Sequence, residues 1–302
     1  MTPVPIQLRT RDPIDVALTL RVMGRGPQDP VLRVLGRRTW YVARTPEGPV
    51  TCSFEQRDAR VVEAILWGAG AQWQADRLAD LVGDTEGCAD LSPAHEQVRV
   101  AHHRYPGLRI PRTGLVLQAL IPAILEQRVV GADASASRRR LLRKWGEPAP
   151  GPAPEGMVVP PSAEQWCAVP SWEWHRAGVD PQRSRTIVQA AGRATRIEET
   201  VSMARPTAYA RLQALPGVGP WTAAETAKIA WGDTDAVSVG DYHLGRFVVW
   251  ALTGDRTGDD ARMLELLEPY RPHRQVVIRL LELTVQMPRR GPRAPRVDHR
   301  GH

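Results

Sequence analysis

The stretch LPGVGPWTAAETAKIAWGDTDAVSVGDYHLGRF, residues 215–247, contains the pattern that decides the fold. It follows the end of a predicted helix, which Pro216 cannot continue because proline has no backbone N–H group. Gly217 and Gly219 allow positive φ angles and leave bare backbone at the surface. A strong helix-forming run, WTAAETAKIA, comes next. The stretch therefore predicts two helices joined by a tight turn.

The start of the second helix is suited to binding phosphate, because its free N–H groups and the helix dipole attract anions. Such a contact positions a protein on a nucleic-acid backbone without selecting a sequence. We expect this hairpin contact to involve Leu215, Pro216, Gly217, Val218, Gly219 and Thr222. Carbonyls left over in the turn can hold a Na⁺ or K⁺ ion, for which we expect the backbone oxygens of Gln213, Leu215 and Val218. The alternative is an ordinary helix corner whose glycines serve only its geometry.

Asp241 comes just before a third predicted helix. The apolar residues Leu244, Phe247 and Val248 recur at helical spacing, so one face of that helix is expected to be buried. An aspartate at this position caps the helix, which contributes about 1 kcal/mol of stability. Capping alone is a sufficient explanation of a single aspartate, and a second role has to come from its pairing with the hairpin.

The composition is that of a globular chain long enough for two domains, with 302 residues, 42% hydrophobic and 24% charged. A net charge of +7 favours a polyanionic partner such as nucleic acid. The alternative is a compositional bias toward arginine, since Lys144 and Lys228 are the only lysines. The N-terminus lacks a signal-peptide pattern, and no run approaches the ~18 apolar residues of a membrane span.

Cysteine usage excludes two kinds of metal site. Cys52, Cys88 and Cys167 are far apart and form no CxxC pair, so neither a zinc knuckle nor an iron–sulfur cluster is expected. Scattered thiols in odd number are typical of a reducing cytoplasm.

The periodicity predicts an α+β chain in three parts. Residues 1–92 form a small α/β domain with an antiparallel sheet, with strands expected at 14–23, 32–45 and 48–54 and helices at 59–70 and 74–83. Only helices are expected in residues 93–286, interrupted by a proline-rich loop. The basic, glycine- and proline-rich tail 287–302 is expected to be disordered.

The hairpin and Asp241 together resemble the helix-hairpin-helix DNA glycosylases, and most closely their 3-methyladenine DNA glycosylase II branch. The resemblance extends to YPGLRIPRT (105–113), AILEQRV (123–129) and PYRPHRQVV (269–277). It implies an all-helical glycosylase domain that follows a small domain with an antiparallel sheet. It also implies an enzyme that acts on double-stranded DNA with damaged bases and requires no cofactor for its chemistry. We expect a monomer in the bacterial cytoplasm, associated with the nucleoid.

The resemblance makes Asp241 the catalytic carboxylate. Cleavage of an N-glycosidic bond builds positive charge on the sugar, which a carboxylate beside C1′ stabilises. Alkylated purines are already cationic and leave without much acid assistance. In the lyase members of the family, a lysine just after the hairpin glycines forms a Schiff base. Trp221 stands at that position and Lys228 lies two helical turns further on, so we expect a glycosylase without lyase activity.

The same resemblance assigns the residues that handle the flipped base. Gln127 and Arg128 are expected to act as the wedge, where this branch often has leucine. Trp221, Tyr242, Leu281 and Glu282 are expected in the base pocket, with Leu281 and Glu282 at the place of a tryptophan that stacks on the base in other members. Trp172 and Trp174 are further aromatic candidates for it.

Three alternatives stay open at this point. The chain can be a non-catalytic DNA- or lesion-binding protein, or a glycosylase for a different damaged base. The basic run RRRLLRKW (138–145) can contact DNA or be a solvated helix face.

Overall fold

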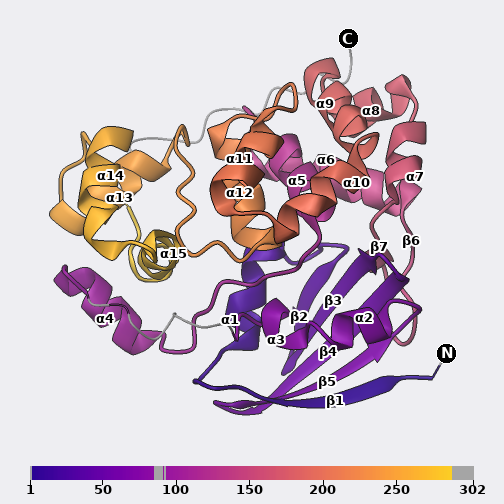
Figure 1. The fold of residues 1–302 in the computed structure, drawn as a ribbon, viewed down its shortest axis with the longest axis horizontal. Coiled ribbons are helices and arrows are strands. Elements are labelled where there is room, and N and C mark those ends of the chain that lie inside the picture. The colour runs from indigo at the N-terminus through magenta and orange to yellow at the C-terminus, as the bar shows by residue number, and fades with distance from the viewer. Residues whose placement is uncertain (1, 85–90, 92, 288–302) are drawn as a thin grey trace.

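The chain folds into one antiparallel sheet and two groups of helices, as a computed structural model of residues 2–84, 91 and 93–287 shows (Figure 1). The class is therefore α+β, as predicted. The strands pair in the order β1-β5-β4-β3-β2, with every neighbouring pair antiparallel. Their bounds are β1 Val4–Arg9, β2 Leu32–Leu35, β3 Arg38–Thr45, β4 Gly48–Asp58 and β5 Val61–Trp67. A short pair, β6 (Glu147–Pro148) and β7 (Val158–Val159), lies in the proline-rich loop.

Two segments of residues 1–92 differ from the prediction. Residues 16–23 were expected in a strand but form α1 (Val16–Leu20) and a 3₁₀ turn, because the Asp15 side chain caps the Leu18 N–H. Residues 61–67 were expected to be helical but form β5, whose inward residues Val62, Ala64 and Leu66 alternate with more exposed ones. Strand β1 was not predicted and pairs with β5 at the sheet edge.

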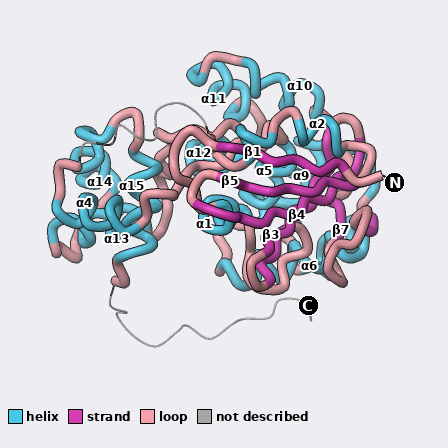
Figure 2. Tube along the Cα trace, turned by 90° about the horizontal axis from the view of Figure 1, so that it is seen from below, coloured by secondary structure: helices cyan, strands magenta, loops and turns pink. Residues whose placement is uncertain are grey.

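Apart from the short helices α1, α2 and α3, the helices form two groups that Figures 1 and 2 show side by side. The first covers the sheet and contains α5 to α12; the second contains α4, α13, α14 and α15. Their bounds are α2 Ala71–Ala75, α3 Leu78–Leu81, α4 Glu96–Arg104, α5 Val116–Leu125, α6 Gly131–Trp145, α7 Ala163–Ala168, α8 Ser171–Ala177, α9 Pro181–Ala191, α10 Ala194–Glu198, α11 Arg205–Gln213, α12 Pro220–Ala230, α13 Leu244–Thr253, α14 Asp260–Leu267 and α15 Arg274–Thr284. None of the helices in the described ranges has the length and apolar character needed to cross a membrane.

Each group has its own hydrophobic core. One core joins the sheet residues Val50, Cys52 and Phe54 to the apolar faces of α5 and α12. The other packs α4 against α13, α14 and α15, with Tyr270 fully buried in it. The segment 231–243 passes from the first group to the second and contains Asp241. The tail 288–302 lies outside the described residues, as does Cys88.

Candidate active site

The predicted hairpin is present between α11 and α12. Gly217 has φ +87°, and a Cβ atom there would lie 2.3 Å from the Thr186 hydroxyl oxygen, so only glycine fits. Gly219 is the N-cap residue of α12 and has φ −97°. It therefore does not use the positive φ that glycine allows. A Cβ atom on Gly219 would meet nothing within 4 Å. The second glycine thus leaves an open approach to the start of α12.

Only part of the expected hairpin surface is exposed. Pro216 and Gly217 face solvent, whereas the side chains of Leu215, Val218 and Thr222 are buried. These three anchor the turn in the protein, because burying them stabilises its conformation. Any contact that these residues make with a ligand would therefore come from their backbone, as the hairpin prediction requires.

Of the two predicted wedge residues, Gln127 is hydrogen-bonded to the hairpin and Arg128 is exposed. The Gln127 side-chain amide donates hydrogen bonds to the Gly217 carbonyl and to the Thr222 hydroxyl, both at 2.8 Å. Gln127 therefore braces the hairpin. Arg128 is exposed and has φ +54°, an unusual conformation for a residue other than glycine. Val130, two residues on, is 64% exposed.

Asp241 is held by three donors. Its Oδ1 accepts the N–H groups of His243 and Leu244 at 2.8 and 2.9 Å, so the carboxylate caps the start of α13. Its Oδ2 accepts the Trp221 indole N–H at 2.9 Å. Capping and a chemical role are compatible, because each oxygen of a carboxylate has two lone pairs.

A groove of about 1480 Å³ brings the hairpin, the loop after α5 and Asp241 to one surface. It also includes the start of α9, with Asp180 and Arg183. Its lining residues are Glu126, Gln127, Arg128, Val129, Val130, Gly131, Asp180, Gln182, Arg183, Gln213, Ala214, Leu215, Pro216, Gly217, Val218, Gly219, Trp221, Thr222, Gly240, Asp241, Tyr242 and His243.

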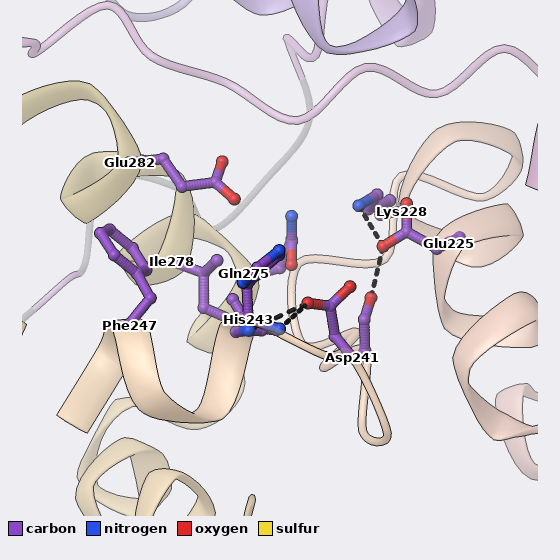
Figure 3. Close-up of a pocket in the computed structure, with 10 residues that line it drawn as sticks. Glu225, Lys228, Asp241, His243, Phe247, Gln275, Ile278 and Glu282 are labelled. Atoms are coloured by element: carbon purple, nitrogen blue, oxygen red, sulfur yellow. Dashed lines mark hydrogen bonds and ion pairs between the residues drawn. The ribbon is translucent and has the colours of Figure 1, made fainter. Parts of the chain in front are cut away.

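A smaller cavity of about 250 Å³ opens between the two groups of helices (Figure 3). Its walls come from α12, α13 and α15, with Asp241 between them. The lining residues are Glu225, Lys228, Ser238, Asp241, His243, Leu244, Phe247, Gln275, Ile278 and Glu282. Asp241 and His243 line both the groove and the cavity, so the carboxylate stands where the two meet.

The structure brings only Glu282 of the four predicted pocket residues to this cavity. Trp221 lies in the groove, where it holds Asp241, and Tyr242 is 86% exposed at the groove rim. Leu281 is fully buried in the second core, because it lies with Leu280 on the inward face of α15. Trp172 and Trp174 lie on α8 and line neither space.

Sequence reasoning missed Glu225 and Lys228 as cavity residues. A signal was available, since Trp221, Glu225 and Lys228 are spaced four and three apart and share one face of α12. Gln275 was also missed, and its position depends on contacts between distant segments. Its N–H donates to the Thr234 carbonyl at 2.8 Å. Arg274 beside it makes a two-pronged ion pair with Asp235, at 2.7 Å for each bond.

Two residues of the basic run 138–145 form ion pairs within the protein. Arg138 is buried in an ion pair with Asp29, and Lys144 pairs with Glu173 at 2.6 Å. Within the described ranges, no cluster of three or more His, Cys, Asp or Glu side chains could hold a metal ion.

Solved structures of known proteins share this fold. No family model matches the chain. Its structure is similar to that of the 3-methyladenine DNA-glycosylase from Archaeoglobus fulgidus, with a TM-score of 0.77, 17% identity, and coverage of 92% of this chain and 98% of that one. It is also similar to the 8-oxoguanine glycosylase/lyase of Clostridium acetobutylicum, with a TM-score of 0.68, 10% identity, and coverage of 93% and 96%. The chain thus has the fold of a helix-hairpin-helix DNA glycosylase, as predicted.

A sequence relative points to one branch of that class. A probable bifunctional transcriptional activator/DNA repair enzyme AlkA from Mycobacterium tuberculosis is 33% identical over 172 residues. The match covers 56% of this chain and about a third, 34%, of the relative's length. Together with the A. fulgidus structure, it supports the predicted resemblance to 3-methyladenine DNA glycosylases.

Proposed function

We propose that this chain is a DNA glycosylase that removes alkylated purines from double-stranded DNA, acting as a monomer in the bacterial cytoplasm. The observation that carries the proposal is the position of Asp241, which lines both the groove and the cavity. A duplex in the groove can be gripped by the hairpin, and a base turned out of the stack can enter the cavity. The sugar of that nucleotide then lies beside the carboxylate.

The chemistry follows from this position. As the base leaves, positive charge develops at C1′, and the Asp241 carboxylate stabilises it. The Trp221 indole and the two backbone N–H groups keep the carboxylate in a fixed orientation, so little reorganisation is required during the reaction. The same carboxylate can orient the water that attacks C1′.

We propose further that the reaction stops at base removal. Trp221 occupies the position of the lyase lysine and cannot form a Schiff base, and Lys228 is paired with Glu225. The DNA strand should then stay intact after base release until it is heated in alkali. Treatment with borohydride should trap no covalent complex between the protein and DNA.

The hairpin is also suited to a structural Na⁺ or K⁺ ion, because its backbone carbonyls are hard oxygen ligands. The Leu215 carbonyl accepts the Val218 N–H at 3.0 Å and retains a second lone pair. The Gln213 and Val218 carbonyls would complete the set. Such an ion would add positive charge where a phosphate approaches.

The test of the function is direct. The protein is incubated with duplex DNA treated with a methylating agent, and the released bases are separated by chromatography. Free methylated purines are expected. Tight binding of the same DNA without any released base would instead identify a non-catalytic lesion-binding protein.

A further inference from the structure

An ionic network forms one wall of the cavity (Figure 3). The Lys228 ammonium donates to Glu225 Oε1 at 2.5 Å, and the Ser238 hydroxyl donates to the same oxygen at 2.6 Å. We call Lys228, Glu225 and Ser238 the Lys228 network. The Lys228 and Glu225 side chains are only 16% and 12% exposed. Charges this far from water require partners, so the network holds the ammonium group in place.

Lys228 lines the cavity and has hydrogen-bond donors that the network does not use. An ammonium group has three N–H donors, and among the residues that the structure describes only Glu225 accepts one from Lys228. Ser238 has already given its single proton to Glu225. A molecule in the cavity that presents an acceptor to Lys228 satisfies the remaining donors. A molecule that presents an amino group there cannot accept a hydrogen bond from the ammonium group, because both groups are donors.

The remaining lining offers little stacking. Phe247 is the one aromatic residue other than His243 among the cavity residues, beside the aliphatic Leu244 and Ile278. Glu282 lies on the opposite side, from α15, and is paired with Arg279 (Figure 3). A base in this cavity is therefore distinguished more by the polar groups on its edge than by the area of its rings.

We propose that Lys228, fixed by Glu225, determines specificity by donating a hydrogen bond to a carbonyl oxygen of the flipped base. The substrate class is then damaged bases with a carbonyl group on that edge, such as 6-oxopurines, in preference to 6-aminopurines. The inference rests on the proposed function, since it assumes that the cavity receives the base. It gives Lys228 a role in recognition and none as a nucleophile.

The test uses two products formed in the same DNA. Duplex DNA treated with dimethyl sulfate contains 7-methylguanine, which has a carbonyl at C6, and 3-methyladenine, which has an amino group there. Single-turnover release of both bases is measured for the wild type and for Lys228→Met. The variant should lose roughly tenfold or more in 7-methylguanine release relative to 3-methyladenine release, because a site built to hydrogen-bond a group discriminates strongly. An unchanged ratio would overturn the inference.

Two further variants separate recognition from folding. Lys228→Met leaves Glu225 without its ion pair, so the double variant Glu225→Gln/Lys228→Met removes both charges and should show the same selective loss. Glu282→Gln, on the opposite side, should affect both products to the same extent. A covalent borohydride adduct formed by the wild type and lost in Lys228→Met would make Lys228 a nucleophile and would overturn the inference. A wild-type protein that releases neither base would contradict the proposed function itself.

Discussion

At the scale of single residues, the site depends on the way Asp241 is held. Three donors from two separate segments converge on one carboxylate: the Trp221 indole from α12 and the backbone N–H groups of His243 and Leu244. A carboxylate at a helix start needs only the backbone donors for capping. The indole bond therefore adds orientation, and it links the residue after the hairpin to the proposed chemistry.

Replacing Trp221 by phenylalanine tests that link. Trp221→Phe removes the indole donor and keeps an aromatic ring in the groove, so base release should fall about tenfold, the value of a lost hydrogen bond to a charged group. DNA affinity should change little. Single-turnover base release and fluorescence anisotropy measure the two quantities. Trp172→Phe, at an exposed position on α8, is the matched control and should behave as the wild type.

The acid in the Lys228 network predicts a pH dependence of stability. Burial opposes the charge on Glu225, but the Lys228 ammonium, hydrogen bonds from Lys228 and Ser238, and the charge of Arg25 outweigh it and lower the pKa of Glu225 below its usual 4.5. A lowered folded-state pKa contributes stability that is present above pH 4.5 and is lost as the pH falls through the folded value. The free energy of unfolding should therefore decrease below pH 4.5.

Glu225→Gln is the comparison for this effect. Other carboxyl groups contribute equally to both proteins, so the difference between their unfolding free energies isolates Glu225. The variant should lose less stability than the wild type on acidification below pH 4.5. If the unfolding free energies of the two proteins changed with pH in parallel, Glu225 would not contribute to this pH dependence, contrary to the prediction.

At the scale of elements, the two glycines of the hairpin have different structural roles. Gly217 needs its positive φ and its missing Cβ, because Thr186 packs against it. Gly219 needs neither for folding, since its φ is negative and the space around it is open. Its bare backbone is instead available to an incoming phosphate.

The two alanine variants should therefore diverge. Gly217→Ala forces a residue with a side chain into the left-handed region against Thr186, and we expect a loss of about 1–3 kcal/mol in the free energy of unfolding. Gly219→Ala should fold normally but bind duplex DNA more weakly, because its methyl group stands at the phosphate approach. Denaturant unfolding and DNA-binding titrations give the two measurements. Equal stability of both variants would contradict the geometry of Gly217.

Elements set by local signals could be predicted from the sequence. The hairpin, the helix after it and the cap at Asp241 depend on glycine, proline and carboxylate chemistry within a few residues. Strand β5 could not be predicted, because the short apolar run VVEAILW suits a helix or a strand and is decided by pairing with β1 and β4. The cavity was missed for a similar reason, since Lys228 and Gln275 are distant in the sequence and line one cavity only in the folded chain.

At the scale of the whole molecule, charged residues of segment 25–29 are joined to the two helices beside the groove loop 127–130. Asp29 is fully buried and accepts N–H groups from Arg25, Val31 and Leu32, as well as the Arg138 guanidinium of α6. Arg25 in turn pairs with Glu126, the residue before Gln127. Segment 25–29 thus contacts both helices that flank the loop 127–130.

Neutralising Asp29 tests how much this junction contributes. Asp29→Asn leaves the buried Arg138 guanidinium without its counter-charge, and breaking such a pair costs about 3–5 kcal/mol in the free energy of unfolding. Asp133→Asn makes the same charge change at an exposed site in α6 and should cost less than about 1 kcal/mol. Denaturant unfolding of both variants measures the difference. Similar stabilities would show that the junction contributes little.

The most direct test of the proposed function compares Asp241→Asn with the wild type on duplex DNA that contains methylated purines. Asparagine keeps the size of the side chain and one oxygen for the α13 cap, but it removes the charge that stabilises the developing oxocarbenium ion. We expect single-turnover base release to fall by about 100-fold or more, while DNA affinity stays within a small factor of the wild-type value. Base release by Asp241→Asn at the wild-type rate would contradict the account.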